Sequence, residues 1–137
     1  AALREALALP DLDLRTGRAE TLAHDPGLRE SFDFVVSRAV ASMAVLAELA
    51  VPFCRVGGIV VAQKAQRAED EVREASGAIE AMGARLKEIK EVAVDIVSET
   101  RCLVVLEKTG ATPVRYPRRP GIPRKRPLRE FPAPPRR

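Results

Sequence analysis

The segment "IVVAQK" (59–64) constrains the fold most, because its first four residues are apolar and do not alternate with polar ones. A strand with one face in water alternates, whereas an uninterrupted apolar strand is typical of a parallel sheet covered on both faces. The preceding "RVGG" (55–58) predicts a turn that leads into this strand. The segment therefore indicates an α/β fold with a mostly parallel sheet.

Other segments supply the remaining elements of such a fold. Strands are expected where apolar residues alternate or β-branched residues gather, at 12–17, 32–41, 84–94 and 101–108. Helices are expected at 1–9, at 40–51 before Pro52, and at 65–83, where apolar residues recur three and four positions apart until Gly83. Residues 18–23 are expected to begin a helix or form a turn. The two consecutive strands at the end predict a central strand at 101–108 and one antiparallel member of the sheet.

Charge divides the chain of 137 residues into two parts. Residues 111–137 hold nine basic residues and one acid, a net charge of 9 − 1 = +8, while the whole chain carries +4, so residues 1–110 carry −4. The sequence therefore predicts one acidic domain over 1–110 and a basic, proline-rich tail over 111–137 that favours an anionic partner.

Several classes of function find no support in the residues. No apolar run reaches the ~20 residues that a membrane-spanning helix needs, and a cytoplasmic protein is expected. Cys54 and Cys102 lie in apolar runs without metal-ligand spacing, so we expect buried free thiols, and His24 is expected to face solvent in a polar loop. The sequence shows no catalytic triad and no metal-ligand cluster. Methyl transfer to a lone pair stays possible, because it chiefly needs alignment and desolvation.

Polar groups follow three of the predicted strands, at "GRAE" (17–20), "SRA" (37–39) and "QK" (63–64). Each could be a solvated strand end or an acid in the first turn of a helix. Ligands of α/β sheets bind beyond the carboxyl ends of the strands, so the three groups together favour a binding site at that edge.

Four stretches together resemble the ribosomal RNA small subunit methyltransferase G family, also called glucose-inhibited division protein B. They are "GRAE" (17–20), the segment from "FDFVVSRA" to "VVAQKA" (32–65), "TRCLVVLEK" (100–108) and above all "TPVRYPRRPGIPRKRPL" (112–128). The likeness implies a class I methyltransferase with a Rossmann-like sheet that uses S-adenosylmethionine to methylate N7 of a guanine in 16S rRNA. That nitrogen has a lone pair and no proton to lose, in agreement with the missing acid and base groups.

Site residues follow from the resemblance wherever its motifs are present. Ala19 and Glu20 match the pair that lines the adenine end of the cofactor, and Arg38 matches an arginine that contacts the cofactor site. Lys64 matches the lysine of the family's usual "LKG" and is expected to contact the substrate RNA. This chain reads "QKA" there, which changes the loop that follows. Arg101 matches a family arginine that is expected to face the RNA. No catalytic residue and no metal ligand is implied.

The resemblance also implies segments that this sequence does not contain. The family's N-terminal helices, its first strand with a glycine-rich cofactor loop and its second strand with a ribose-binding acid would all precede Ala1. In the usual strand order 3-2-1-4-5-7-6, residues 12–17 would then lack their neighbouring strand. We therefore expect a Rossmann-like sheet truncated at its N-terminus, with half a cofactor site.

Arginines spaced by prolines are expected to form a stiff, extended segment that cannot collapse into a core. Because guanidinium groups bind phosphates through two nitrogens, the tail motif is expected to contact rRNA phosphates. Its basic residues are Arg115, Arg118, Arg119, Arg124, Lys125 and Arg126. The expected partner is 16S rRNA or an assembly intermediate of the small ribosomal subunit, bound by a monomer. The structural alternatives for the tail are a solvated, disordered terminus and a strap on the domain surface. Functional alternatives are a noncatalytic RNA-binding module and a methyltransferase with another substrate, but a small molecule gives no reason for a charge of +8.

Overall fold

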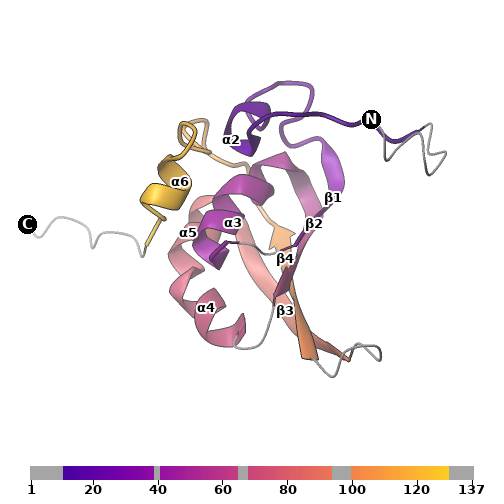
Figure 1. Ribbon diagram of the computed structural model, residues 1–137, viewed down its shortest axis with the longest axis vertical. Coiled ribbons are helices and arrows are strands. Elements are labelled where there is room, and N and C mark those ends of the chain that lie inside the picture. Colours follow the sequence, from indigo (N-terminus) through magenta and orange to yellow (C-terminus); the bar gives the residue numbers. More distant parts are fainter. Residues whose placement is uncertain (1–10, 39–40, 65–67, 94–99, 130–137) are drawn as a thin grey trace, which may run out of the picture.

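The computed structural model describes residues 11–38, 41–64, 68–93 and 100–129. Figure 1 shows the helices α3, α4 and α5 on one side of a curved sheet. The elements, in chain order, are α2 (Ala19–Leu22), β1 (Phe32–Arg38), α3 (Met43–Ala50), the 3₁₀ turn η1 (Val51–Phe53), β2 (Cys54–Lys64), α4 (Ala68–Glu74), α5 (Ser76–Ala81), β3 (Ala84–Ala93), β4 (Thr100–Lys108) and α6 (Ile122–Lys125). The helix predicted at 1–9 lies outside the described residues.

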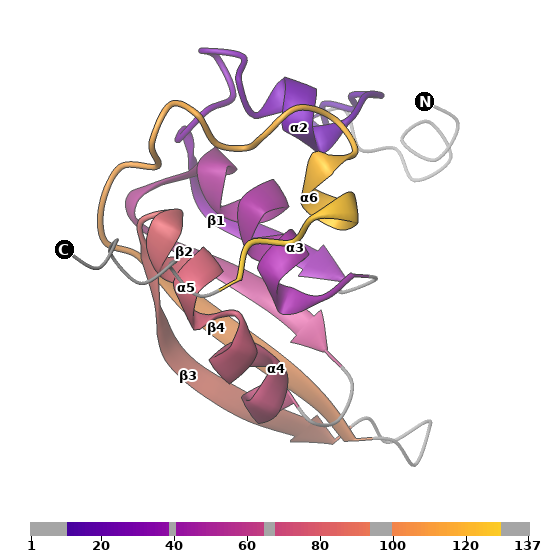
Figure 2. The same cartoon turned by 90° about the vertical axis from the view of Figure 1, so that its left-hand side faces the viewer.

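The four strands form one mixed sheet in the order β1-β2-β4-β3 (Figure 2). β1 and β2 are parallel, whereas β4 runs antiparallel to both of its neighbours. The α/β class, the central position of β4 and the single antiparallel strand are thereby confirmed. The observed order equals the 4-5-7-6 part of the strand order that the family resemblance implies.

The strand predicted at 12–17 is wrong. These residues form no strand, and Leu12 and Leu14 are exposed. A strand needs a neighbour for its main-chain hydrogen bonds, and alternation of side chains cannot replace that neighbour.

The turn predicted at 55–58 is also wrong, because these residues lie inside β2, which begins at Cys54. The register between β1 and β2 shifts between Phe32 and Phe34, so the extra residues of β2 are accommodated by an irregularity within the strand. Gly57 has a φ of 88°, a conformation that glycine adopts readily. Glycine is common in turns for the same reason, which explains why the sequence pattern predicted a turn here.

The helix predicted at 65–83 consists of two helices, α4 and α5, that meet at Ala75. The predicted apolar stripe is nevertheless correct for the described part of this segment, because Ala68, Val72, Ala75, Ile79 and Met82 are all buried. Residues 65–67 lie outside the described part of the chain.

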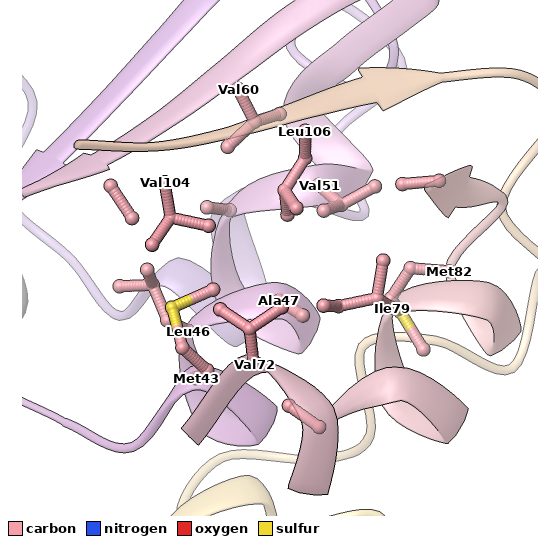
Figure 3. Packing of buried hydrophobic residues seen from close by; sticks show 14 of the residues in the cluster. Met43, Leu46, Ala47, Val51, Val60, Val72, Ile79, Met82, Val104 and Leu106 are labelled. Carbon is pink, nitrogen blue, oxygen red and sulfur yellow. The ribbon is translucent and has the colours of Figure 1, made fainter. Parts of the chain in front are cut away.

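The core lies between these helices and one face of the sheet. Figure 3 shows the α3 and α4 side chains Leu46 and Val72 near Val104 of β4, with Val60 and Leu106 above them. Cys54 and Cys102 belong to the same core and are free thiols, as predicted. Within the described ranges, no helix is long and apolar enough to cross a membrane.

The opposite face of the sheet is less covered near β1. Phe34 and Val36 are 67% and 73% exposed, although both are apolar residues of a strand. β1 stands at the end of the strand order, so β2 is its neighbour in the described sheet.

A lysine lies buried where β4 ends. The Nζ atom of Lys108 donates to the carbonyl of Val51 at 3.0 Å and to Oγ1 of Thr112 at 2.6 Å, and lies 3.2 Å from a carboxylate oxygen of Glu30. Burial lowers the pKa of Lys108, while the carboxylate of Glu30 opposes that shift. The end of β4 with the residues that follow it, the turn after α3 and the segment before β1 therefore meet at one ammonium group.

Replacing Gly83 tests the connection between α5 and β3. Gly83 has a φ of 86°, and a Cβ atom there would collide with the main-chain carbonyl of Gly110. We expect Gly83→Ala to lower the free energy of unfolding by at least about 1 kcal/mol in urea titrations, because a left-handed conformation alone costs an L-residue about 1–2 kcal/mol. The matched control is Gly110→Ala, whose Cβ would meet nothing within 4 Å. Equal losses in the two variants would contradict the prediction.

Candidate functional site

The carboxyl ends of β1 and β2 meet at one edge of the sheet, as the sequence predicts. Arg38, the last residue of β1, is the register partner of Gln63 in β2. Its side chain is exposed, and residues 39–40 lie outside the described part. Arg38 therefore places a cation where ligands of parallel α/β sheets bind.

Lys64, the last residue of β2, is engaged within the protein. Its ammonium donates to the carbonyl of Ala41 at 2.7 Å and forms an ion pair with Glu71 of α4. Glu71 also accepts a hydrogen bond from the main-chain nitrogen of Met43, at the start of α3. Lys64 thus ties the end of β2 to two helices, and a contact of Lys64 with RNA stays a prediction.

Glu20 is a buried acid in α2, beside the half-buried Ala19. Its Oε2 atom accepts hydrogen bonds from Nη2 of Arg18 at 3.0 Å and from the main-chain nitrogen of Gly121 at 2.8 Å. Burial by itself raises the pKa of Glu20, but main-chain hydrogen bonds, led by that of Gly121, and the Arg18 guanidinium outweigh it and lower the pKa. The carboxylate is therefore held in its charged form.

The predicted convergence of three strand ends is only partly correct. Arg38 and Lys64 share one edge through the pairing of β1 with β2. "GRAE" (17–20) does not follow a strand, because residues 12–17 are not one, and Glu20 contacts the C-terminal tail. A cofactor-binding role for Ala19, Glu20 and Arg38 stays a prediction.

The tail is packed onto the rest of the protein over residues 112–128, which we call the strap. Figure 2 shows this segment leaving the end of β4, passing α2 and continuing through α6 beside α3. The guanidinium of Arg29 donates to three strap carbonyls, those of Thr112, Pro113 and Tyr116, at 3.0, 3.0 and 2.8 Å. Arg29 therefore fixes the first part of the strap.

The prediction that prolines keep this segment away from the core is wrong for part of it. Pro117 and Pro123 are fully buried. A proline has no N–H group, so its burial leaves one polar group fewer to satisfy. His24 is exposed, as predicted, but its Nε2 atom also lies 2.6 Å from the carbonyl of Pro117. The structural alternative of a surface strap thus describes residues 112–128.

Arg118 and Glu48 form an ion pair between the strap and α3. The carboxylate of Glu48, whose side chain is 0% exposed, accepts hydrogen bonds from the main-chain nitrogen of Arg118 at 2.7 Å and from its Nη2 at 2.8 Å. The same Nη2 atom donates to the carbonyl of Arg126 at 2.6 Å. Arg118 therefore has a structural partner, and a contact between Arg118 and RNA stays a prediction.

The other basic residues of the strap point outward. Arg115 lies over the ring of Tyr116, 4.9 Å from its centre. Arg101 of β4 is half-buried and takes part in an interaction of its own. The exposed cations of the strap are Arg115, Arg119, Arg124, Lys125 and Arg126. They form a positive surface attached to the domain, and their contact with RNA stays a prediction, as does that of Arg101.

Sequence reasoning missed Glu48 and Lys108 as functional positions. A signal existed for both. Glu48 is the single acid of the apolar segment 43–53, and Lys108 follows Val104 and Leu106 at a spacing of two, which places it on the buried face of β4. No local sequence signal identifies Arg29 as the partner of the strap, because the strap residues that it contacts lie more than 80 residues away in the chain.

Comparisons with known proteins agree on the family. A family model described as "rRNA small subunit methyltransferase G" matches residues 1–100. Curated proteins named ribosomal RNA small subunit methyltransferase G match at 46% identity in Pelotomaculum thermopropionicum and at 45% in Deinococcus deserti, over 92% and 93% of this chain. The chain covers 54% and 52% of those two relatives, so it spans about half the length of the curated relatives that it matches.

Solved structures support the fold. The crystal structure of the M1.HpyAVI–SAM complex has a TM-score of 0.55 with this chain at 13% sequence identity, and covers 72% of this chain and 54% of its own. At that identity the likeness concerns the arrangement of strands and helices alone. It is consistent with the class I methyltransferase fold that the sheet order indicates.

Replacing Arg118 tests whether it supports the structure. We expect Arg118→Gln to lower the free energy of unfolding by about 3 kcal/mol, because removing one partner of a buried ion pair costs about 3–5 kcal/mol and Arg118 is partly exposed. Arg119→Gln, next in the chain and exposed, should change it by less than about 0.5 kcal/mol. Urea unfolding followed by circular dichroism measures both. Similar small losses would mean that the pair with Glu48 is not formed in solution.

Proposed function

The chain belongs to the rRNA small subunit methyltransferase G family, and on this premise we propose that it serves to methylate N7 of a guanine in 16S rRNA, with S-adenosylmethionine as methyl donor. The observation that carries the proposal is the 46% identity, over 92% of the chain, with a relative of that name. Because the chain spans about half of that relative, the activity is proposed for the whole protein.

We propose that Ala19, Glu20 and Arg38 hold part of the cofactor. A buried, charged carboxylate at Glu20 and an exposed cation at the carboxyl end of β1 suit the polar ends of S-adenosylmethionine. The cofactor supplies an electrophilic methyl group on a sulfonium. The acceptor nitrogen needs no base, so the task of the protein residues is to bind, orient and exclude water.

The RNA-binding part of the proposal assigns different tasks to the basic residues of the strap. Arg118 faces Glu48, and the exposed cations face outward. Cations on a segment that is already docked lose little conformational freedom when they bind phosphates, which favours affinity. We propose that Arg115, Arg119, Arg124, Lys125 and Arg126 contact the phosphate backbone of 16S rRNA, free or in an assembling subunit. A monomer acting in the cytoplasm is part of the same proposal.

A noncatalytic RNA-binding module is the second candidate. It is favoured by one observation, that the exposed cations of the strap suit RNA phosphates and need no methyl donor for that contact. The two candidates differ in whether the protein binds S-adenosylmethionine and transfers its methyl group. A methyltransferase for another substrate would label a different acceptor.

Replacing Arg38 tests the catalytic proposal in the protein as its gene encodes it. We expect Arg38→Ala to lower kcat/KM for methyl transfer to 16S rRNA at least about tenfold, because a hydrogen bond to a charged group contributes about 1.5–3 kcal/mol. The measurement is incorporation of a labelled methyl group, with chemical cleavage at 7-methylguanine to locate the product. Lys87→Ala, an exposed change in β3, is the control. Unchanged turnover in Arg38→Ala would remove Arg38 from the site.

Salt dependence tests the contact between strap and RNA. Neutralising phosphates releases counterions, so the logarithm of affinity falls with the logarithm of salt concentration, by about 0.7 per contact for single strands. We expect the triple change Arg119→Gln, Arg124→Gln, Lys125→Gln to weaken binding of a 16S rRNA fragment and to flatten that slope by about 2.

The matched control for this experiment carries three exposed changes away from the strap, Arg73→Gln, Lys87→Gln and Lys90→Gln. Both variants lose the same charge, so a slope that flattens equally in both would mean a general electrostatic effect. An unchanged slope in the strap variant would mean that these cations make no RNA contact.

A further inference from the structure

The strap reaches the predicted cofactor site directly. Glu20 is 5% exposed, and one of the two donors on its Oε2 atom is the main-chain N–H of Gly121, at 2.8 Å. The other donor, Arg18, is a neighbour in the chain, whereas Gly121 lies 101 residues away. A residue that binds cofactor in the proposed function is thus held by the segment that binds RNA.

The position of the Gly121 N–H group depends on the strap's own geometry. Gly121 precedes α6 and has a φ of 86°, so the local chain turns sharply there. Three residues earlier, Arg118 is fixed to the buried Glu48 of α3 by its main-chain nitrogen and by its guanidinium. A continuous path therefore runs from α3 through Arg118 and Gly121 to Glu20 in α2.

We propose that Arg118 is a positioning residue for the cofactor site: by fixing the strap to Glu48, it holds the Gly121 N–H group on Glu20 and couples RNA binding to S-adenosylmethionine binding. The inference rests on the proposed function, since it takes Glu20 as a cofactor residue and the strap as an RNA contact. It adds a physical connection between the two sites.

The physical reason is the burial of Glu20. A buried carboxylate that loses one of its donors is left with an unsatisfied charge, so it reorients or takes up a proton. Displacing the strap would have that effect on Glu20, and RNA that holds the strap in place would prevent it. Such coupling is reciprocal, so the cofactor must raise RNA affinity by the same factor as RNA raises cofactor affinity.

The test measures the dissociation constant of S-adenosylmethionine by calorimetry, with and without a saturating 16S rRNA fragment, in the protein as its gene encodes it. We expect RNA to tighten cofactor binding in the wild type by about tenfold, within the usual range of such couplings. Arg118→Gln should weaken cofactor binding in the absence of RNA. RNA that holds the loosened strap in place should restore much of that loss, so the coupling factor of this variant should exceed that of the wild type. Thermal unfolding, recorded in parallel, shows that each variant is folded at the temperature of the titration.

Arg119→Gln is the matched control, because it removes the same charge one residue away without touching Glu48. It should lower RNA affinity while cofactor affinity and the coupling factor stay those of the wild type. If Arg118→Gln does not fold, Arg118→Lys replaces it, since lysine keeps the charge beside Glu48 but lacks the second nitrogen. Its coupling factor should likewise exceed that of the wild type, by less than that of Arg118→Gln would.

Two results would overturn the inference and differ from a failure of the proposed function. If Arg118→Gln, or Arg118→Lys in its place, lowers only stability or RNA affinity and leaves cofactor binding and coupling unchanged, the strap is merely structural. If RNA and cofactor bind the wild type independently, there is no coupling to explain. Absence of cofactor binding to the wild type would instead reject the proposed function, and the inference with it.

Discussion

The buried ammonium of Lys108 anchors the start of the strap, and the rest of the strap continues from this point. Its partners are the carbonyl of Val51 after α3, the hydroxyl of Thr112 at the start of the strap, and the carboxylate of Glu30 before β1. A lysine with no exposed side-chain surface is tolerated only where its charge is paired and its protons have acceptors. These contacts join the start of the strap to the segments before β1 and after α3.

Glu48 of α3 is a second buried charge that holds the strap, and it contacts the strap farther along the chain, at Arg118. Its side chain lies in α3 among apolar residues and is fully enclosed, while Arg118 closes over it from the strap. A buried ion pair need not add stability over a well-packed apolar pair, but removing one partner is costly. We therefore infer that Lys108 and Glu48 determine where the strap lies on the domain. They hold the strap beside α3, with its exposed cations outward and Gly121 against Glu20.

This arrangement changes how the basic tail is understood. A count of charges treats its arginines as equivalent, whereas the structure separates Arg118, which faces a buried acid, from Arg119, which is exposed. A mutation that removes all of them would mix a loss of structure with a loss of RNA contact. The proposed separation of positioning residues from contact residues therefore requires variants that leave Arg118 unchanged.

The sequence by itself determined the elements whose periodicity is local. The apolar runs of β2 and β4, the buried stripe of α4 and α5 and the buried thiols of Cys54 and Cys102 all follow from residue spacing, and the family motifs implied the sheet order. The alternation at 12–17 predicted a strand that does not form, because a strand needs a neighbouring strand to pair with. Gly57 and Gly58 predicted a turn where β2 continues with an irregularity. Only the tertiary structure decided that Glu20 meets Gly121, that Glu48 meets Arg118 and that Lys108 meets Glu30. Spacing shows which face a residue occupies, but the partner of a buried charge is set by how distant segments pack.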